Sequence, residues 1–169
     1  TGGTVSGVGR VLREKSPETK IILTEPENAA LIGSELKQDR HSDNTPATSH
    51  SSWNPHLIQG WTPDFIPFVL QEAIDNNYFD KLLPVSGEQG ITWAKRLARA
   101  EGIITGISGG STFAIAMEVA KDAPPDSNIL CMLPDTGERY LSSPLFEEIP
   151  EEMTDDEKKI SLSTPNYQL

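Results

Sequence analysis

Short apolar segments rich in β-branched residues alternate with helical segments along this chain, and their order restricts the fold to a layered α/β type. Residues 20–26 and 81–85 have the composition of short buried strands. Helical periodicity fills residues 5–15 before the first of them and residues 87–100 after the second. Such an alternation is typical of a mainly parallel sheet flanked by helices.

Local signals predict the individual elements. Ser86 followed by Gln89 forms a capping box before the helix at 87–100, and Gly102 provides its stop. The remaining predicted elements are a helix over 28–36, partial helix over 68–80, a largely apolar and buried helix over 111–122, and a strand over 128–133.

Composition excludes several classes of protein. A chain of 169 residues can bury one domain core, and no apolar run in it is long enough to span a membrane. Its net charge of −11 argues against nucleic acid as a partner. The single cysteine, Cys131, fits a reducing, cytoplasmic location and a buried structural role. Three histidines without ligand spacing predict no metal site (His41, His50, His56).

The chain divides into a predicted folded part, residues 1–146, and an acidic C-terminal tail, residues 147–169. Residues 37–55 are rich in small polar side chains and read as a surface loop or an insertion. The tail concentrates acidic residues, and we expect it to be solvated (Glu147, Glu148, Glu151, Glu152, Asp155, Asp156, Glu157). The first residue, Thr1, stands inside a glycine turn, so we expect the chain to be the C-terminal portion of a longer polypeptide.

Two glycine-rich turns carry the functional signal. Thr1, Gly2, Gly3 and Thr4 precede a helix, and such a turn lets backbone N–H groups and hydroxyls surround a phosphate at the positive end of the helix dipole. The second turn, residues 106–110, also leads into a helix. Two such turns suit an anionic cofactor that is held at both ends.

The glycine patterns do not match the common nucleotide-binding motifs. No Gly-Lys pair exists for a P-loop. For a dinucleotide-binding fingerprint, Gly7-Val8-Gly9 lacks the third glycine, because position 12 is Leu, and residues 106–110 have the wrong spacing. A tight turn without a ligand, or a general phosphate-binding protein, remains open for residues 1–4. Ser108 can hydrogen-bond a ring nitrogen, but unlike a carboxylate it cannot hold that nitrogen protonated; alternatively Ser108 or Ser111 caps the following helix.

Four short segments in consistent order resemble one enzyme family. They are TGGTVSGVGRVLRE from Thr1, LIQGWTPDFIP from Leu57, EGIITGISGGST from Glu101 and LPDTGERYLS from Leu133. Together they resemble the pyridoxal phosphate (PLP)-dependent enzymes of fold type II, the tryptophan synthase β-like fold. Within that family they are most similar to cysteine synthase (O-acetylserine sulfhydrylase) and cystathionine β-synthase.

The resemblance implies roles for particular residues. Thr1, Gly2, Gly3 and Thr4 would bind the PLP phosphate, and Ser108 would face the pyridine nitrogen. Gln59 and Gly60 would line the substrate side of the cleft, where an ordinary loop turn is the alternative. Residues 135–140 would lie near the ring end of the cofactor. The lysine that forms the Schiff base is expected upstream, so no catalytic residue is assigned in this chain.

The resemblance also implies an activity and partners. The intact protein would make cysteine from O-acetylserine and sulfide by β-replacement through an aminoacrylate intermediate, while this portion alone is not expected to be active. Condensation of serine with homocysteine, as in cystathionine β-synthase, is one alternative. A non-catalytic binding module that keeps the fold is another. A homodimer, an amino-acid substrate and a C-terminal peptide of serine acetyltransferase are the implied partners.

Overall fold

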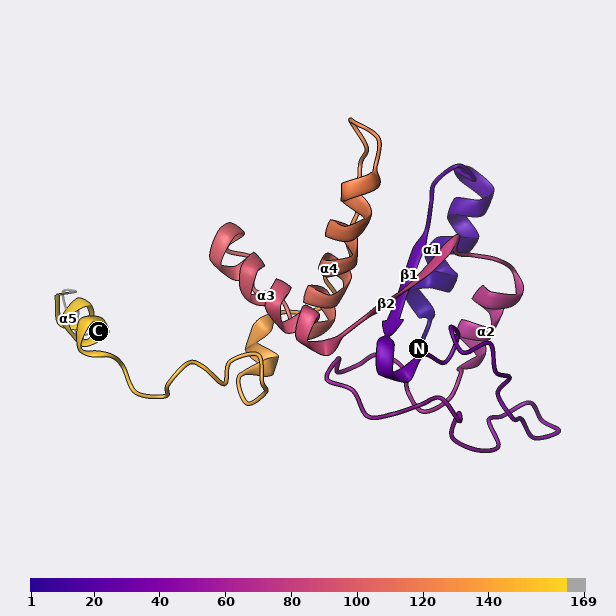
Figure 1. The fold of residues 1–169 in the computed structure, drawn as a ribbon, viewed down its shortest axis with the longest axis horizontal. Coiled ribbons are helices and arrows are strands. Elements are labelled where there is room, and N and C mark those ends of the chain that lie inside the picture. The colour runs from indigo at the N-terminus through magenta and orange to yellow at the C-terminus, as the bar shows by residue number, and fades with distance from the viewer. Residues whose placement is uncertain (164–169) are drawn as a thin grey trace, which may run out of the picture.

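The structure is a computed structural model, and it describes residues 1–163. Figure 1 shows the order of its elements. The helices are α1 (Gly3–Lys15), α2 (Phe68–Asp75), α3 (Gly87–Glu101), α4 (Ile107–Asp122) and α5 (Asp155–Ser163). The strands are β1 (Ile22–Pro26) and β2 (Lys81–Val85), and the 3-10 turns are η1 (Glu27–Ala29) and η2 (Gly137–Tyr140).

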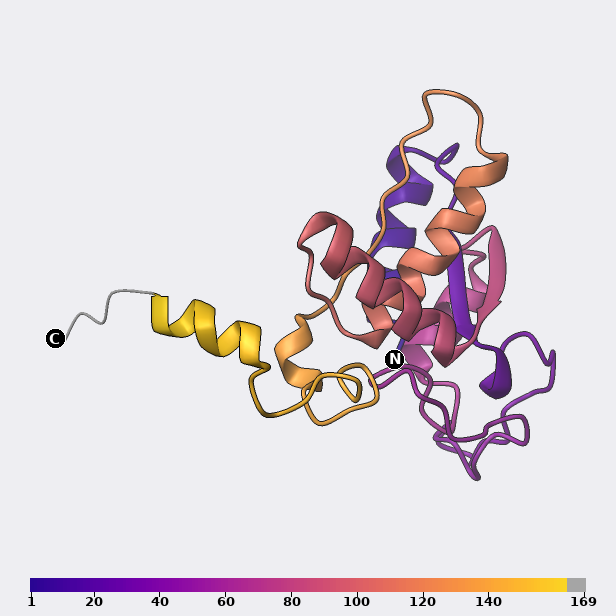
Figure 2. The ribbon, with the colours of Figure 1, turned by 60° about the vertical axis from the view of Figure 1, so that its left-hand side comes forward.

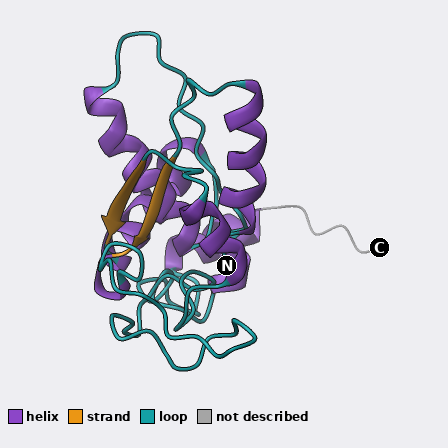
Figure 3. Ribbon diagram, turned by 90° about the vertical axis from the view of Figure 1, so that its right-hand side faces the viewer, coloured by secondary structure: helices purple, strands orange, loops and turns teal. Residues whose placement is uncertain are grey.

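The two strands form a parallel sheet, as the sequence predicts. Ile22 lies opposite Lys81 and Pro26 opposite Val85. The carboxyl ends of both strands therefore meet at one edge, and Figure 3 shows the arrowheads pointing toward the same end of the molecule. Loops that follow parallel strands gather at this edge, which is where α/β proteins place ligand sites.

Helices pack in two pairs around the sheet. α1 packs on α2, whereas α3 packs on α4, which also contacts β2. In Figure 1, α3 and α4 stand to the left of the strands and α2 to the right. The larger core cluster joins α3 and α4 to β2 and to the loops at 58 and 140–146. The smaller cluster lies beyond β1 and consists of Ala29, Leu31 and Ile66.

The capping signals around α3 are confirmed. Ser86 Oγ accepts the N–H of Gln89 at 3.1 Å, and Gln89 Oε1 accepts the N–H of Ser86 at 2.9 Å. Gly102 ends the helix in the left-handed conformation, with φ 68°. Because both signals are local, the helix could be predicted within about a residue of its observed ends.

Three predicted elements differ from the structure. The helix expected over 28–36 is only the single turn η1, followed by turns. The segment 128–133 is not a strand, because no described strand lies beside it to share backbone hydrogen bonds. α4 begins at Ile107, four residues earlier than expected, so the glycines after it lie inside a helix. Cys131, expected to be buried in that strand, is only half-buried.

The acidic C-terminal segment lies apart from the core. α5 has no buried residue, and Figures 1 and 2 show it at the end of an extended segment. One ion pair, Lys95 Nζ to Glu148 Oε2 at 3.0 Å, attaches the beginning of this segment to α3. Among residues 1–163, no helix is both long and apolar enough to cross a bilayer.

Candidate functional site

The start of α1 presents backbone donors that no described side chain caps. Gly2 is the N-cap, and the N–H of Ser6 donates to its carbonyl at 2.9 Å, so the N–H groups of residues 3–5 have no acceptor within the helix. The first turn contains no acidic residue, and Thr1 and Thr4 are exposed. This is the arrangement in which a helix start binds an anion.

The two glycines of this turn differ in what they require. Gly2 has φ 90°, and a Cβ on it would lie 2.7 Å from the Cα of Leu70. Both its conformation and its contact with α2 therefore exclude a side chain. A Cβ on Gly3 would meet nothing within 4 Å. The space beside Gly3 is open, so a ligand can approach its backbone.

Contacts with α2 fix the start of α1 beside the sheet. The buried hydroxyl of Ser6 donates to the carbonyl of Val69 at 2.5 Å. Leu70, the neighbour of Gly2, packs on the smaller core cluster, which includes Ala29 at the end of η1. Since η1 directly follows β1, the turn lies beyond the carboxyl end of that strand.

Ser108 lies in the first turn of α4 and is 3 % exposed. The N-cap of α4 is Gly106, and no side-chain hydrogen bond caps this helix. Ser111 instead donates to the carbonyl of Ile107 at 2.8 Å, one turn back. The capping role considered for Ser108 or Ser111 is therefore wrong.

A carboxylate and a phenol surround the entrance to α4. Asp135 Oδ1 accepts the N–H of Gly106 at 3.3 Å, and Asp135 Oδ2 accepts the hydroxyl of Tyr140 at 2.5 Å. Burial raises the pKa of the Tyr140 phenol, and the Asp135 carboxylate raises it further, whereas a hydrogen bond with Ser108 opposes the rise. At neutral pH the phenol is therefore protonated and donates to Asp135.

The Gln59–Gly60 step is an exposed turn held by buried neighbours. Gly60 has φ 82°, in the left-handed region that favours glycine. Ile58 on one side is fully buried, and Trp61 on the other packs against the same cluster. The same cluster also contains Ile107, the first residue of α4, and Tyr140.

The predicted site residues fall into two groups. Ser108, the Gln59–Gly60 step and the segment 135–140 surround the larger core cluster, whereas residues 1–4 are attached to the smaller one. In the described chain no hydrogen bond or ion pair joins the groups. Both lie at the carboxyl edge of the sheet, because Ile107 packs with Val85 of β2 and Val85 pairs with the last residue of β1. In Figures 1 and 3 the first residue lies toward the same end as the arrowheads.

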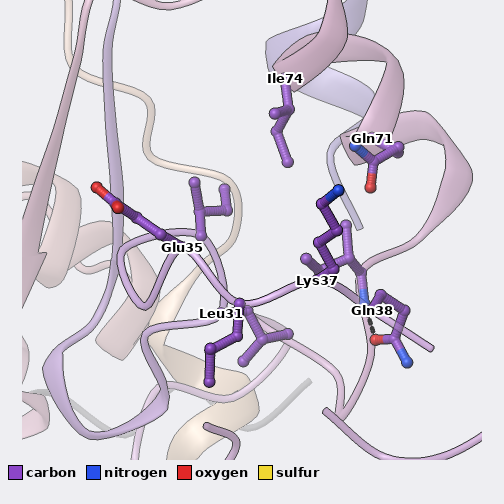
Figure 4. Close-up of a pocket in the computed structure, with 9 residues that line it drawn as sticks. Leu31, Glu35, Lys37, Gln38, Gln71 and Ile74 are labelled. Atoms are coloured by element: carbon purple, nitrogen blue, oxygen red, sulfur yellow. Dashed lines mark hydrogen bonds between the residues drawn. The ribbon is translucent and has the colours of Figure 1, made fainter. Parts of the chain in front are cut away.

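Two cavities of about 300 Å³ lie elsewhere along this edge. The first, of 310 Å³, is formed between residues 31–38 and α2; Figure 4 shows the Lys37 side chain extending toward Gln71 and Ile74. The second, of 300 Å³, is lined by His56, Leu57 and Gly87, next to the Gln59–Gly60 step. None of the residues predicted to bind a cofactor or substrate lines either cavity.

The resemblance predicts residues 135–140 near the ring end of the cofactor, but the contact between Asp135 and Tyr140 within that segment is visible only in the structure. Their hydrogen bond depends on η2, which turns the chain so that Tyr140 faces back to Asp135. A Cβ on Gly137 would come within 2.4 Å of Ile104 Cγ2, which explains the glycine between them. The Asp-Thr-Gly order is the only signal in the sequence from which this turn could have been found.

Comparison with known proteins identifies the family. Residues 1–135 match the family described as pyridoxal-phosphate dependent enzyme. The chain is 40% identical over 164 residues to O-ureido-L-serine synthase of Streptomyces lavendulae, covering 97% of this chain and 44% of that protein. It is 34% identical over 146 residues to cysteine synthase of Staphylococcus aureus strain Mu50, covering 86% of this chain and 41% of that protein.

Solved structures agree with these matches. The crystal structure of O-ureido-L-serine synthase superposes with a TM-score of 0.74 at 39% identity, covering 94% of this chain and 43% of that chain. The O-acetylserine dependent cystathionine β-synthase from Helicobacter pylori superposes with a TM-score of 0.67 at 30% identity, over 86% of this chain and 40% of that one. The chain thus spans less than half the length of the curated relatives it matches.

Proposed function

This chain belongs to the family of pyridoxal-phosphate dependent enzymes, whose members use PLP, and we propose that its full-length protein catalyses β-replacement on an activated serine. The relatives support this class, since two of them are named as synthases of serine-derived amino acids. The observation that supports the proposal most directly is the uncapped start of α1 at the carboxyl edge of the sheet.

The residues at this edge fit the cofactor. Free N–H groups at residues 3–5, the exposed hydroxyls of Thr1 and Thr4 and the open space at Gly3 match the needs of a phosphate dianion. A buried serine at the second helix start suits a ring nitrogen, because a hydroxyl can donate or accept there. When bound, PLP supplies a ring that withdraws electrons from the amino acid.

In this proposal each segment has a separate task. Residues 1–4 hold the phosphate through main-chain N–H groups and hydroxyls, aided by the dipole of α1. Ser108 orients the ring through its nitrogen. The Gln59–Gly60 step lines the substrate side, where its exposure leaves the amide of Gln59 free to bind an amino-acid substrate. A lysine outside this chain provides the amine that binds the cofactor and moves the proton of the substrate.

The leading reaction is the synthesis of cysteine from O-acetylserine and sulfide. A second candidate comes from the relative that is 40% identical to this chain. Its name describes a product in which a ureido group is bonded to the side-chain oxygen of serine. Forming that product requires the hydroxyl oxygen of hydroxyurea as the nucleophile in place of sulfide. A third candidate, condensation with homocysteine, is favoured by the likeness to the Helicobacter pylori enzyme.

One experiment decides among these reactions and a non-catalytic binding module. The full-length protein is purified, its absorbance is recorded, and it is incubated with either O-acetylserine or serine, each with equal amounts of sulfide, hydroxyurea and homocysteine. Mass spectrometry then identifies the product. We expect a yellow protein and one dominant amino-acid product. A colourless protein that takes up no added PLP would exclude the proposal, and a yellow protein without any product would leave only the binding module.

The proposal extends to partners and location. A homodimer in the cytoplasm, with a serine acetyltransferase C-terminal peptide docking in the cleft, follows from the resemblance to cysteine synthase. Light scattering of the full-length protein measures whether it is a dimer, and fluorescence titration with the peptide measures whether the peptide binds. A monomeric mass, or no response to the peptide at saturating concentration, contradicts the corresponding part.

A further inference from the structure

The loop that carries the Gln59–Gly60 step is a closed turn. The N–H of Trp61 donates to the carbonyl of Ile58 at 3.3 Å, and Gly60 between them has φ 82°. This hydrogen bond and the glycine conformation are those of a type II β-turn, whose third residue needs a positive φ. Gln59 and Gly60 are exposed at the corner of the turn, whereas Ile58 is fully buried. The position of the corner therefore depends on the contacts of the residues at its two ends.

The residue after this turn, Thr62, has an unfavourable backbone conformation. Its φ is 39°, in the left-handed region. Thr62 is β-branched and stands before Pro63, and both features favour an extended backbone. For a β-branched residue a positive φ is an outlier that the surrounding structure must enforce, and such strain gathers at functional sites. Contacts from outside the turn must therefore hold Thr62 in this conformation.

Two side chains supply these contacts by bonding to one carbonyl oxygen. Nε1 of Trp53 donates to the carbonyl of Thr62 at 3.0 Å, and Nε2 of His56 lies 3.2 Å from the same oxygen. Because a carbonyl only accepts, Nε2 carries the hydrogen and donates it, and both lone pairs of the oxygen are used. The other ring nitrogen of His56, Nδ1, is buried and has no partner within residues 1–163, so this imidazole is hydrogen-bonded to Thr62 alone.

The bond from Trp53 also connects the two clusters of the core. Trp53 packs against the smaller cluster, whereas Trp61 packs against the larger one. Leu70, which also packs on the smaller cluster, is the residue that Gly2 contacts. The hydrogen bond to Thr62 therefore links the substrate step to the part of the core on which the turn at residues 1–4 is built.

We propose that Trp53 and His56 are positioning residues of the substrate site. Their two hydrogen bonds hold Thr62 in the left-handed conformation, and this keeps the Gln59–Gly60 turn in the orientation that meets the amino-acid substrate. When a donor is removed, Thr62 relaxes toward the extended region and the turn moves with it. The inference rests on the proposed function, because it requires Gln59 and Gly60 to line the substrate side of the cleft.

The test is steady-state kinetics of the full-length enzyme, with the amino-acid substrate varied and the nucleophile saturating. Trp53→Phe removes the indole N–H and keeps an aromatic ring against the smaller cluster. The amide nitrogen of asparagine stands near the position of Nδ1 in histidine, and that of glutamine stands near Nε2. His56→Asn therefore removes the donor to Thr62, whereas His56→Gln retains one. The matched control is Trp93→Phe, because Trp93 lies on α3 and its indole N–H bonds no described residue.

We expect Trp53→Phe and His56→Asn each to raise KM for the amino-acid substrate about tenfold, as for the loss of one hydrogen bond to the substrate. The kcat and the Kd for PLP should stay unchanged, since only substrate binding is weakened. His56→Gln and Trp93→Phe should match the wild type. A purely structural role would lower the melting temperature without separating KM from kcat. Unchanged KM in both donor variants would overturn the inference and leave the proposed function intact, whereas a wild-type protein that binds no PLP overturns both.

Thr62→Gly provides a second background, which serves if a donor variant does not fold. Glycine adopts φ 39° without strain, so the loop no longer depends on both donors. Trp53→Phe and His56→Asn should fold in this background, and the rise in KM should be smaller than with threonine. Donor variants that still fail to fold with glycine at position 62, or that raise KM equally in both backgrounds, overturn the inference.

Discussion

Gly110 of α4 lies directly against Gly90 of α3: a Cβ on Gly110 would stand 2.0 Å from the Gly90 carbonyl oxygen, and one on Gly90 would stand 2.3 Å from Ser111 Oγ. The two backbones approach so closely that neither position has room for a methyl group. This contact fixes the direction of the helix whose first turn carries Ser108.

The first prediction concerns this crossing. Gly110→Ala forces the helices apart, and we expect a loss of about 1–3 kcal/mol in the free energy of unfolding. Denaturant unfolding of the full-length protein measures it. Gly7→Ala in α1 is the matched control, because a Cβ there meets nothing within 4 Å and alanine is the better helix former. Equal stability of Gly110→Ala and wild type would contradict the close contact between α3 and α4 at this position.

A second prediction separates folding from cofactor binding at the start of α1. Thr4→Asp places a negative charge in the first turn, which stabilises the cofactor-free helix by about 0.3–1 kcal/mol. The same charge repels the phosphate, so the Kd for PLP should rise at least about tenfold. Thermal melting without cofactor and fluorescence titration with PLP measure the two effects.

The control for Thr4→Asp carries the same charge elsewhere. Ser161→Asp adds it to the exposed helix α5 and should leave the Kd unchanged. If Thr4→Asp binds PLP as tightly as this control, residues 1–4 do not hold the phosphate.

The third prediction tests the anchor of α1. Ser6→Ala removes the hydrogen bond from the buried Ser6 hydroxyl to the Val69 carbonyl and should cost about 0.5–1.5 kcal/mol of stability. Ser127→Ala is the comparison, because its bond to the Pro124 carbonyl at 2.7 Å is exposed to water. Matching losses in the two variants would show that the anchor on α2 is no stronger than a surface contact.

These residues show which parts could be predicted from the sequence. β2 and α3 are marked by neighbours only a few positions away, the capping pair Ser86 and Gln89 and the stop at Gly102, so their positions were predictable. The segment 128–133 has strand composition, yet a strand forms only beside another strand. Its Leu130 is 95 % exposed, which local composition could not indicate.

The site shows the same division. The turns at residues 1–4 and 106–110 are visible as glycine patterns, but glycines also predict a break in a helix, which misplaced the start of α4. Gly110 lies inside α4, and its glycine is required by the close contact with Gly90, which is distant in the sequence. The pairing of Tyr140 with Asp135, and of both with Gly106, likewise depends on tertiary structure.

The fourth prediction is a loss of stability in alkali. The pKa of Tyr140 is raised above the value of about 10 that tyrosine has in an unfolded chain. Its contribution to stability is therefore complete below about pH 10 and is lost as the pH rises through the raised pKa of the folded state. Asp135→Asn removes a cause of the rise, so Tyr140 should ionise at lower pH.

Two measurements over the alkaline range test this prediction. Melting temperatures follow the loss of stability, and phenol absorbance follows the ionisation of Tyr140, each compared between wild type and Asp135→Asn. The thiol of Cys131, whose pKa is raised by burial, is present in both proteins and therefore does not account for a difference between them. Identical phenol titrations would mean that Asp135 does not act on Tyr140 in solution.

The last prediction concerns the substrate side. Gln59 is exposed and makes no side-chain hydrogen bond among the described residues, so Gln59→Ala should leave both the melting temperature and the Kd for PLP unchanged. If its amide binds the amino-acid substrate, the loss of that hydrogen bond should lower kcat/KM for O-acetylserine about tenfold. Steady-state kinetics of the full-length enzyme measure this ratio.

Gln38→Ala is the contrasting variant, because the Gln38 side chain accepts the N–H of Ile66 at 3.0 Å and therefore supports the fold. Gln38→Ala should therefore lower the melting temperature. A lower melting temperature for Gln59→Ala as well would assign Gln59 to the fold and remove it from the substrate cleft.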